Sequence, residues 1–200
     1  TPIVKPNSPE ILPPPYALNM REVYIQALEE LAVPFASTKL DGWANFNKMV
    51  GGFRSREYTI LCGPTGAGKT ALLSSWSAQL LRQDVKHFVA SIETGHTDYM
   101  KRVLSCFHGK DINTGDPVDP DELARIHVKS AEYLERDTIE FSLYDNRVDV
   151  KQLMYDIDYM VNFKGVKIAF VDNLNFFLEP KRSSDQLIEM DRVTHELIIF

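Results

Sequence analysis

The chain contains the run Tyr58-Thr-Ile-Leu-Cys-Gly-Pro-Thr-Gly-Ala-Gly-Lys-Thr70, in which a short apolar segment leads into a glycine-rich turn. The last eight residues, Gly63 to Thr70, fit the pattern G-x-x-x-x-G-K-[ST] of a phosphate-binding loop. The pattern has this meaning where a strand precedes it and a helix follows it. Both are predicted here, a strand over Tyr58 to Cys62 and a helix over Lys69 to Leu81. The run therefore predicts an α/β domain that binds a nucleoside triphosphate.

Each residue type in this loop has a physical task. Gly66 and Gly68 let the backbone turn its amide groups toward phosphate oxygens. The Lys69 ammonium neutralises β and γ phosphate oxygens, and the Thr70 hydroxyl is a ligand for Mg²⁺. The alternative, a glycine-rich turn without a ligand, is the rarer meaning of the pattern between a strand and a helix. The predicted nucleotide-binding residues are Gly63, Pro64, Thr65, Gly66, Ala67, Gly68, Lys69 and Thr70.

On the carboxyl side of the loop, segments with strand and helix periodicity alternate along the chain. This order predicts a mostly parallel sheet flanked by helices. One of the helices has a clear start signal, because Asp119, Pro120 and Glu122 supply an N-cap, a first-turn proline and a capping-box partner. The further predicted strands are His87 to Ile92, Thr138 to Tyr144 and Val166 to Val171; the further helices are Thr97 to Phe107, Asp119 to about Leu134, Val148 to Val161 and Ser184 to Phe200.

Two carboxylates at the ends of predicted strands are candidates for binding Mg²⁺ and for activating water. Asp172 ends the apolar run Val166-Lys-Ile-Ala-Phe-Val-Asp172, a pattern typical of a strand that carries a carboxylate to Mg²⁺. Such runs also occur as ordinary strand ends, and the phosphate-binding loop upstream favours the metal role. Glu93 follows Phe88 to Ile92 and is expected at the same edge of the sheet. The spacing fits both a base that activates water and a solvated carboxylate.

A short basic loop is the candidate contact for nucleic acid. Lys181 and Arg182 lie in a polar segment after the Asp172 strand, where they could touch phosphates. A solvated turn is the more common meaning of such a segment. The formal net charge of −6 argues against a broad basic surface, so any contact with nucleic acid has to be local. The five histidines show neither metal-ligand spacing nor a hydrolase triad.

Composition predicts a protein that is not secreted and not held in a membrane. Only two cysteines occur, Cys62 and Cys106, so a disulfide framework is not expected and a reducing compartment fits better. No apolar run reaches the roughly 18 residues that a membrane span needs, and the first residues lack the pattern of a signal peptide. The five histidines and two cysteines are assigned no chemistry.

The first residues form a region of different composition. Six prolines in the first fifteen residues favour an extended linker. Leu18 to Leu31 has an amphipathic helical pattern that stops short of Pro34, and its apolar stripe needs a partner surface. We expect residues 1–36 to be a proline-rich segment with a linker helix, and residues 37–200 an ATPase domain. The chain begins without methionine and stops inside a helical pattern, so we expect a piece of a longer protein.

Over residues 34–200 these motifs resemble the hexameric replicative helicases of the DnaB type, and within them the Twinkle-like and phage primase-helicase branch. Five stretches carry the resemblance: Ser37-Thr-Lys-Leu-Asp-Gly-Trp43, Gly51-Gly-Phe53, Cys62 to Thr70, Ser91-Ile-Glu93 and Val171-Asp-Asn-Leu-Asn175. The resemblance implies a RecA-like core whose last strands are missing from this chain. It implies catalytic roles for Lys69 and for Glu93 as the base, with Thr70 and Asp172 as Mg²⁺ ligands. It also places a DNA-contacting loop at Leu178 to Gln186, which includes Lys181 and Arg182.

For activity and partners, the resemblance implies an ATP-driven motor that moves along single-stranded DNA. It implies a homo-hexamer or similar ring joined through the linker helix, a primase as a further partner, and a place in a bacterial or phage-infected cytoplasm or an organelle matrix. The chain stops before the family's sensor residue and arginine finger, so by itself it is expected to hydrolyse ATP poorly. Two alternatives stay open: a RecA or KaiC type filament or regulatory ATPase, and a non-enzymatic nucleotide-binding assembly module.

Overall fold

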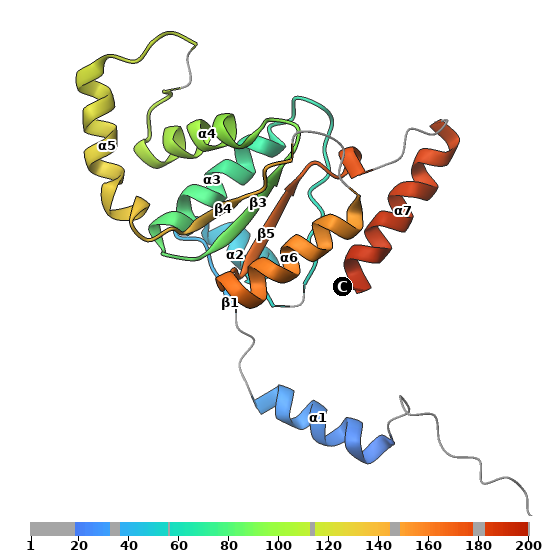
Figure 1. Ribbon diagram of the computed structural model, residues 1–200. Coiled ribbons are helices and arrows are strands. Elements are labelled where there is room, and N and C mark those ends of the chain that lie inside the picture. Colours follow the sequence, from blue (N-terminus) through green and yellow to red (C-terminus); the bar gives the residue numbers. More distant parts are fainter. Residues whose placement is uncertain are drawn as a thin grey trace, which may run out of the picture. The chain divides into compact units, whose positions relative to one another are not determined.

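The computed structural model describes residues 19–32, 37–55, 57–112, 115–144, 149–177 and 183–199. The chain divides into two compact units, Thr1–Ala36 and Ser37–Phe200. In the first unit the described part is one helix, α1 (Met20–Ala32), as the Leu18 to Leu31 pattern predicted (Figure 1). Asn19 and Glu22 cap its start reciprocally, with side-chain to backbone bonds of 3.0 and 2.9 Å.

The second unit is built on a parallel sheet of three strands in the order β4-β3-β5, so the prediction of parallel strands with helical crossovers is confirmed (Figure 1). The strands are β3 (His87–Ser91), β4 (Ile139–Phe141) and β5 (Ile168–Asp172). In the β3–β5 ladder, Ser91 at the end of β3 is opposite Asp172 at the end of β5. The register therefore brings the residues that follow both strands to one edge.

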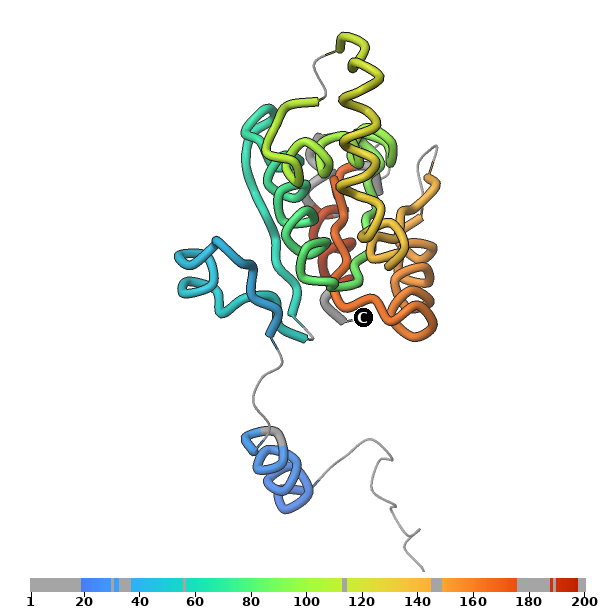
Figure 2. The backbone as a smooth tube through the Cα atoms, turned by 90° about the vertical axis from the view of Figure 1, so that its left-hand side faces the viewer, coloured from blue at the N-terminus to red at the C-terminus, as the bar shows by residue number. Residues whose placement is uncertain are grey.

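Helices cover both faces of the sheet, which is why β3 is buried along its whole length. Val89 packs with residues of α3 (Lys69–Arg82) and α4 (His96–His108). Its neighbours Phe88 and Ala90 face the opposite layer, formed by α6 (Val150–Lys164) and α7 (Ser183–Ile199). Figure 2 shows α3 and α6 on opposite sides of β5. The alternation along β3 thus explains two separate apolar cores.

The predicted strand Tyr58 to Cys62 is wrong. Residues 57–64 have no helix or strand conformation, and Tyr58, Ile60 and Leu61 are exposed. An apolar run identifies a segment that is able to form a strand, but a strand exists only as part of a ladder with a partner. None of the described strands forms a hydrogen-bonded ladder with this segment. Local sequence carries no signal about that missing partner.

A small two-stranded antiparallel sheet next to α2 was not predicted. It consists of β1 (Ser37–Thr38) and β2 (Phe53–Arg54), which pair antiparallel, with α2 (Ala44–Val50) between them. Strands of two residues have no measurable periodicity. Gly52, directly before β2, lies so close to β1 that a Cβ atom there would be 2.7 Å from the Thr38 carbonyl oxygen. The glycine in the Gly51-Gly-Phe53 motif therefore allows the backbones of the two segments to come this close.

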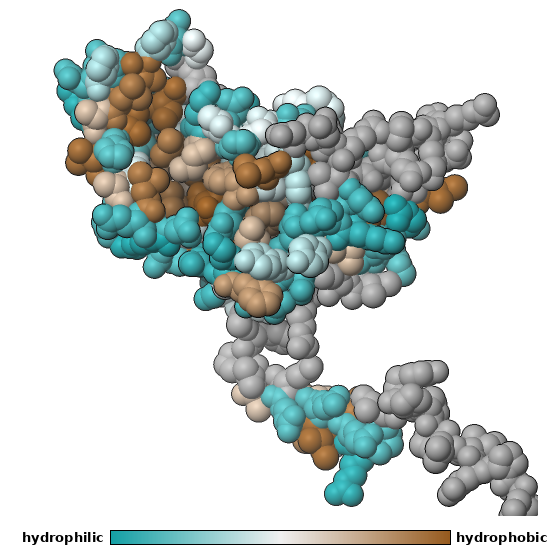
Figure 3. Space-filling view, viewed as in Figure 1, coloured by the Kyte–Doolittle hydropathy of each residue, from teal (hydrophilic) through white to brown (hydrophobic). Residues whose placement is uncertain are grey.

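Helix α5 (Pro120–Leu134) begins as predicted, with Asp119 as its N-cap. The Asp119 carboxylate accepts from the backbone amides of Asp121 and Glu122 at 2.9 and 3.3 Å. The capping-box role of Glu122 is wrong, because its carboxylate pairs with Lys110 and Arg125 instead. Two nearby cations attract a carboxylate more strongly than one backbone amide does. The helix leaves three apolar side chains exposed, Leu123, Val128 and Leu134. Figure 3 shows hydrophobic surface, in brown, in the region of α5.

The remaining elements match their predictions within a few residues. β4 is shorter than the run Thr138 to Tyr144, and α6 begins two residues later than predicted, after its N-cap Asp149. The 3₁₀ turn η1 (Leu174–Phe177) directly after β5 was not predicted. No helix in the described ranges is long and apolar enough to cross a lipid bilayer.

His87, at the start of β3, makes the stability of this fold depend on pH. Its side chain is fully buried, and its Nδ1 lies 2.9 Å from the Val85 carbonyl oxygen. Burial lowers the pKa of His87 from its usual 6.5 to about 4. Between these two values the unfolded chain binds a proton that the folded chain does not. The stability that the fold has while His87 is neutral is therefore fully present above about pH 6.5 and is lost as the pH falls toward 4.

We expect the free energy of unfolding to fall by roughly 2 kcal/mol between about pH 7 and about pH 5 because of His87. Urea unfolding of the chain and of His87→Leu, at both values, measures this contribution. The leucine variant should lose this part of the acid sensitivity, whereas the exposed His127→Gln should keep it. Equal acid sensitivity in all three proteins would contradict the assignment to His87.

Candidate nucleotide-binding site

The glycine-rich loop leads directly into the N-terminus of α3. Gly66 and Gly68 have φ values of +79° and +89°, which side chains with a Cβ rarely adopt. Gly68 is the N-cap of α3, and no side chain caps this helix end. The first turn of α3 also contains no acidic residue. Its amide groups and the positive end of the helix dipole are therefore available to an anion.

Lys69 holds its ammonium group inside this loop. Its Nζ donates to the Gly63 carbonyl oxygen at 2.8 Å and to the Pro64 carbonyl oxygen at 3.1 Å. Both acceptors belong to the same loop, so the positive charge lies among the backbone groups that would surround phosphates. Lys69 is thus placed where an ammonium can act on a phosphate oxygen.

Thr70 and Asp172 meet although 102 residues separate them in the sequence. The Thr70 Oγ1 donates to the Asp172 Oδ2 at 2.7 Å. Thr70 is in the first turn of α3 and Asp172 is the last residue of β5, so the sheet edge and the helix start converge here. Asp172 is only 3% exposed, and this burial raises its pKa, while the bond from Thr70 acts in the opposite direction.

The chemistry of this pair fits Mg²⁺. A hydroxyl and a carboxylate are hard oxygen donors, and Mg²⁺ is commonly held by one or two protein oxygens together with water and substrate phosphates. The described residues contain no cluster of three or more His, Cys, Asp or Glu side chains that could form an all-protein cage. The pair beside the phosphate-binding loop is the arrangement that a metal shared with a nucleotide requires.

Glu93 lies at the same sheet edge, two residues after the end of β3. Its carboxylate is exposed, and its Oε2 accepts a hydrogen bond of 2.5 Å from the Asn173 Nδ2. Asn173 directly follows Asp172. Asn173 belongs to the motif Val171-Asp-Asn-Leu-Asn175, but no role was predicted for it. The signal that could have indicated a role was its position directly after Asp172, because the predicted parallel strands end at the same edge and would bring it close to Glu93.

Part of the predicted DNA-contacting loop is helical. Helix α7 begins at Ser183, so the portion from Ser183 to Gln186 is helical and the prediction is wrong there. Ser184 and Asp185 follow this start, and polar residues of this kind are frequent in a first helical turn. Lys181 and Arg182 lie outside the described residues.

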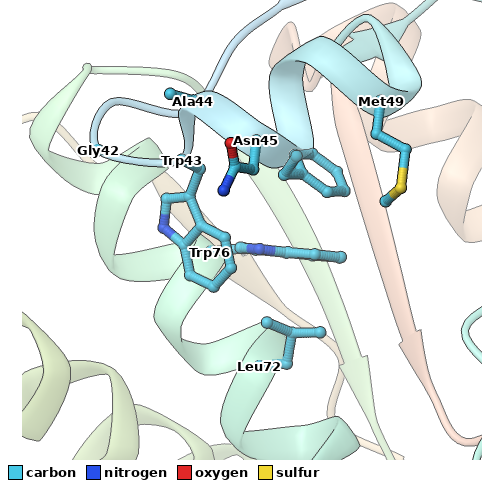
Figure 4. A pocket seen from close by; sticks show the side chains of 8 residues that line it. Gly42, Trp43, Ala44, Asn45, Met49, Leu72 and Trp76 are labelled. Atoms are coloured by element: carbon cyan, nitrogen blue, oxygen red, sulfur yellow. The ribbon is translucent and has the colours of Figure 1, made fainter.

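An apolar hollow of about 550 Å³ lies between α2 and α3 (Figure 4). Trp43 and Phe46 cover Trp76 there, with ring centroids 6.1 and 4.8 Å from that of Trp76. None of its lining residues belongs to the phosphate-binding loop, and neither Glu93 nor Asp172 takes part. With its lining almost entirely apolar, this hollow offers nothing to a triphosphate.

The parallel sheet flanked by helices, with a glycine-rich loop before α3, defines a domain of the RecA-like α/β class. Residues 40–199 match the family model of the DnaB-like helicase C-terminal domain, and the chain belongs to that family. This family relates the chain to the ATP-binding domains of replicative helicases.

A solved structure described as "The Structure Of A DnaB-Like Replicative Helicase And Its Interactions With Primase" is similar to this chain, with a TM-score of 0.65 and 15% sequence identity. The match covers 90% of this chain and 46% of that one. The chain thus spans about half the length of the solved relative. At this identity the likeness shows a shared fold.

Proposed function

We propose that this chain is the ATP-hydrolysing motor domain of a ring-forming DNA helicase that moves along single-stranded DNA. The observation that carries the proposal is the 2.7 Å contact between Thr70 and Asp172, next to a phosphate-binding loop and on the same sheet edge as Glu93. A metal ligand pair, a phosphate cradle and a base candidate are the parts that phosphoryl transfer to water needs. Membership in the DnaB-like family supports DNA unwinding as the use of that chemistry.

In this proposal, the loop amides and Lys69 bind the triphosphate. The ammonium exchanges its carbonyl acceptors on Gly63 and Pro64 for β and γ phosphate oxygens. The N-terminus of α3 adds its dipole, which favours negative charge. Thr70 and Asp172 would hold Mg²⁺, whose contribution is to neutralise charge on the phosphate oxygens.

Glu93 is the proposed general base. A water oxygen attacks the γ phosphorus while the bond from that phosphorus to the bridging oxygen of the β phosphate breaks. Glu93 accepts the proton that this water loses, and ADP and inorganic phosphate leave. Exposure of the carboxylate at the sheet edge supports this role, because water can reach it.

The finer parts of the proposal rest on the family. We propose a homo-hexamer or similar ring in which a neighbouring copy supplies an arginine to each site and α1 serves as the linker helix. Lys181 and Arg182 are proposed to contact DNA phosphates, which fits an acidic chain that needs local basic loops. A primase is a proposed partner, since a structural relative is described together with one.

ATP hydrolysis with and without single-stranded DNA tests this function. The complete gene product is compared with its Lys69→Ala variant, so that only turnover at this site is counted. We expect DNA to raise the Lys69-dependent rate severalfold, and strand displacement on a forked duplex to follow. A rate that DNA leaves unchanged would instead favour a nucleotide-driven assembly or regulatory ATPase. DNA stimulation without strand displacement would favour a RecA type filament.

A further inference from the structure

We infer that Asn173 is a positioning residue for Glu93, holding the carboxylate in the orientation that its role as general base requires. This inference rests on the function proposed above. Its basis is a contact between the ends of two neighbouring strands, in which the Asn173 Nδ2 donates to the Glu93 Oε2 at 2.5 Å. One carboxylate oxygen is thereby fixed and the other is left for water.

A second hydrogen bond determines which end of the Asn173 amide faces Glu93. The Asn173 Oδ1 accepts from the backbone amide of Asn175 at 2.9 Å. A flipped amide would place its oxygen against the carboxylate and its NH₂ group against a backbone N–H, losing both bonds. The Asn173 amide is therefore held with its NH₂ group, a hydrogen-bond donor, toward Glu93.

The backbone holds the two partners at a fixed separation. The Ile92 amide donates to the Asp172 carbonyl oxygen at 2.9 Å, which extends the β3–β5 ladder to the residues just before Glu93 and Asn173. Without a side-chain partner, an exposed glutamate beyond this ladder would sample several rotamers. The bond from Asn173 selects one of them at little cost, because its own side chain is already anchored on Asn175.

This arrangement gives consecutive residues complementary tasks. Asp172 faces Thr70 at the proposed metal position, while Asn173 faces Glu93 at the proposed base. The separation between metal site and base is then set by one peptide unit at the end of β5. Because a misplacement of about 1 Å can cost roughly 100-fold in rate, such a fixed spacing bears directly on turnover.

The test is Asn173→Asp in the complete gene product, which keeps the size of the side chain but removes the donor and sets a like charge against Glu93. We expect kcat for DNA-stimulated ATP hydrolysis to fall about 10- to 100-fold with little change in KM for ATP. Asn173→Gln, which keeps a donor, should recover part of the loss. Asn162→Asp is the matched control, because the Asn162 Nδ2 donates to the Asp158 carboxylate at 2.8 Å on α6, remote in function from the site.

A double-mutant cycle separates positioning from a general structural effect. In a Glu93→Gln background, measured by single turnover with excess protein, Asn173→Asp should cause no further loss. A further loss of the same size, a raised KM, or full activity of Asn173→Asp would overturn the inference. Full activity of Glu93→Gln itself would overturn the role proposed for Glu93, and the inference with it. The two failures are therefore distinguishable.

Discussion

Lys69→Ala is expected to weaken the binding of ATP strongly. The ammonium lies inside the loop, 2.8 and 3.1 Å from the carbonyl oxygens of Gly63 and Pro64. The sequence of the loop contains no second basic residue. Removing it takes away the one side-chain charge of the loop that acts on the β and γ phosphates, so that only the loop amides, the α3 dipole and Mg²⁺ remain. Bound nucleotide would cover the ammonium, and truncating one partner of a buried, hydrogen-bonded charge pair costs about 2 to 5 kcal/mol. The Kd for ATP should therefore rise roughly 30-fold to several thousand-fold.

Titration with a non-hydrolysable ATP analogue in the presence of Mg²⁺ measures this loss. Lys129→Ala is the matched control, since Lys129 is an exposed lysine of α5 and the change in net charge is the same. Its Kd should equal that of the unchanged chain. Thermal unfolding of both variants shows whether the fold is kept. A folded Lys69→Ala protein with unchanged affinity would mean that phosphates are bound elsewhere.

The parts of this structure that follow from the sequence are those with a local cause. The loop and the start of α3 follow from Gly66, Gly68 and the pattern after Lys69, and the N-cap of α5 follows from Asp119. In each of these the deciding groups lie within a few residues of one another. Buried strands such as β3 and β5 were also predictable, because a short apolar run is typical of a strand covered on both faces.

What could not be predicted depends on which segments become neighbours. The run Tyr58 to Cys62 has strand character but lies outside the described ladders, because pairing is a property of two segments. Thr70 and Asp172 were both predicted as Mg²⁺ ligands, but their 2.7 Å contact depends on the register of β5 beside β3. The bond between Asn173 and Glu93 spans 80 residues and depends on that same register.

Glu93→Gln is expected to separate nucleotide binding from hydrolysis. Glutamine has the size of glutamate and keeps an oxygen that can accept the bond from Asn173, so the geometry of the sheet edge should persist. A neutral amide cannot take up the proton of the attacking water. Loss of general base catalysis lowers a rate by about 100- to 10,000-fold. The affinity for ATP should stay within a few-fold, because Lys69 and the loop amides are unchanged.

The complete gene product with single-stranded DNA is the material for this measurement, with hydrolysis and analogue binding followed in parallel. Glu132→Gln is the control and should keep both properties, because it removes an exposed carboxylate of α5 that pairs with Arg136, two residues beyond the helix end. Lys69→Ala and Glu93→Gln then differ in kind, since the first loses binding and the second keeps it. If Glu93→Gln hydrolyses ATP at the unchanged rate, Glu93 is a solvated carboxylate and another group takes the proton. If it loses binding as well, the sheet edge contributes to holding the nucleotide, and the division between cradle and base proposed for this site is wrong.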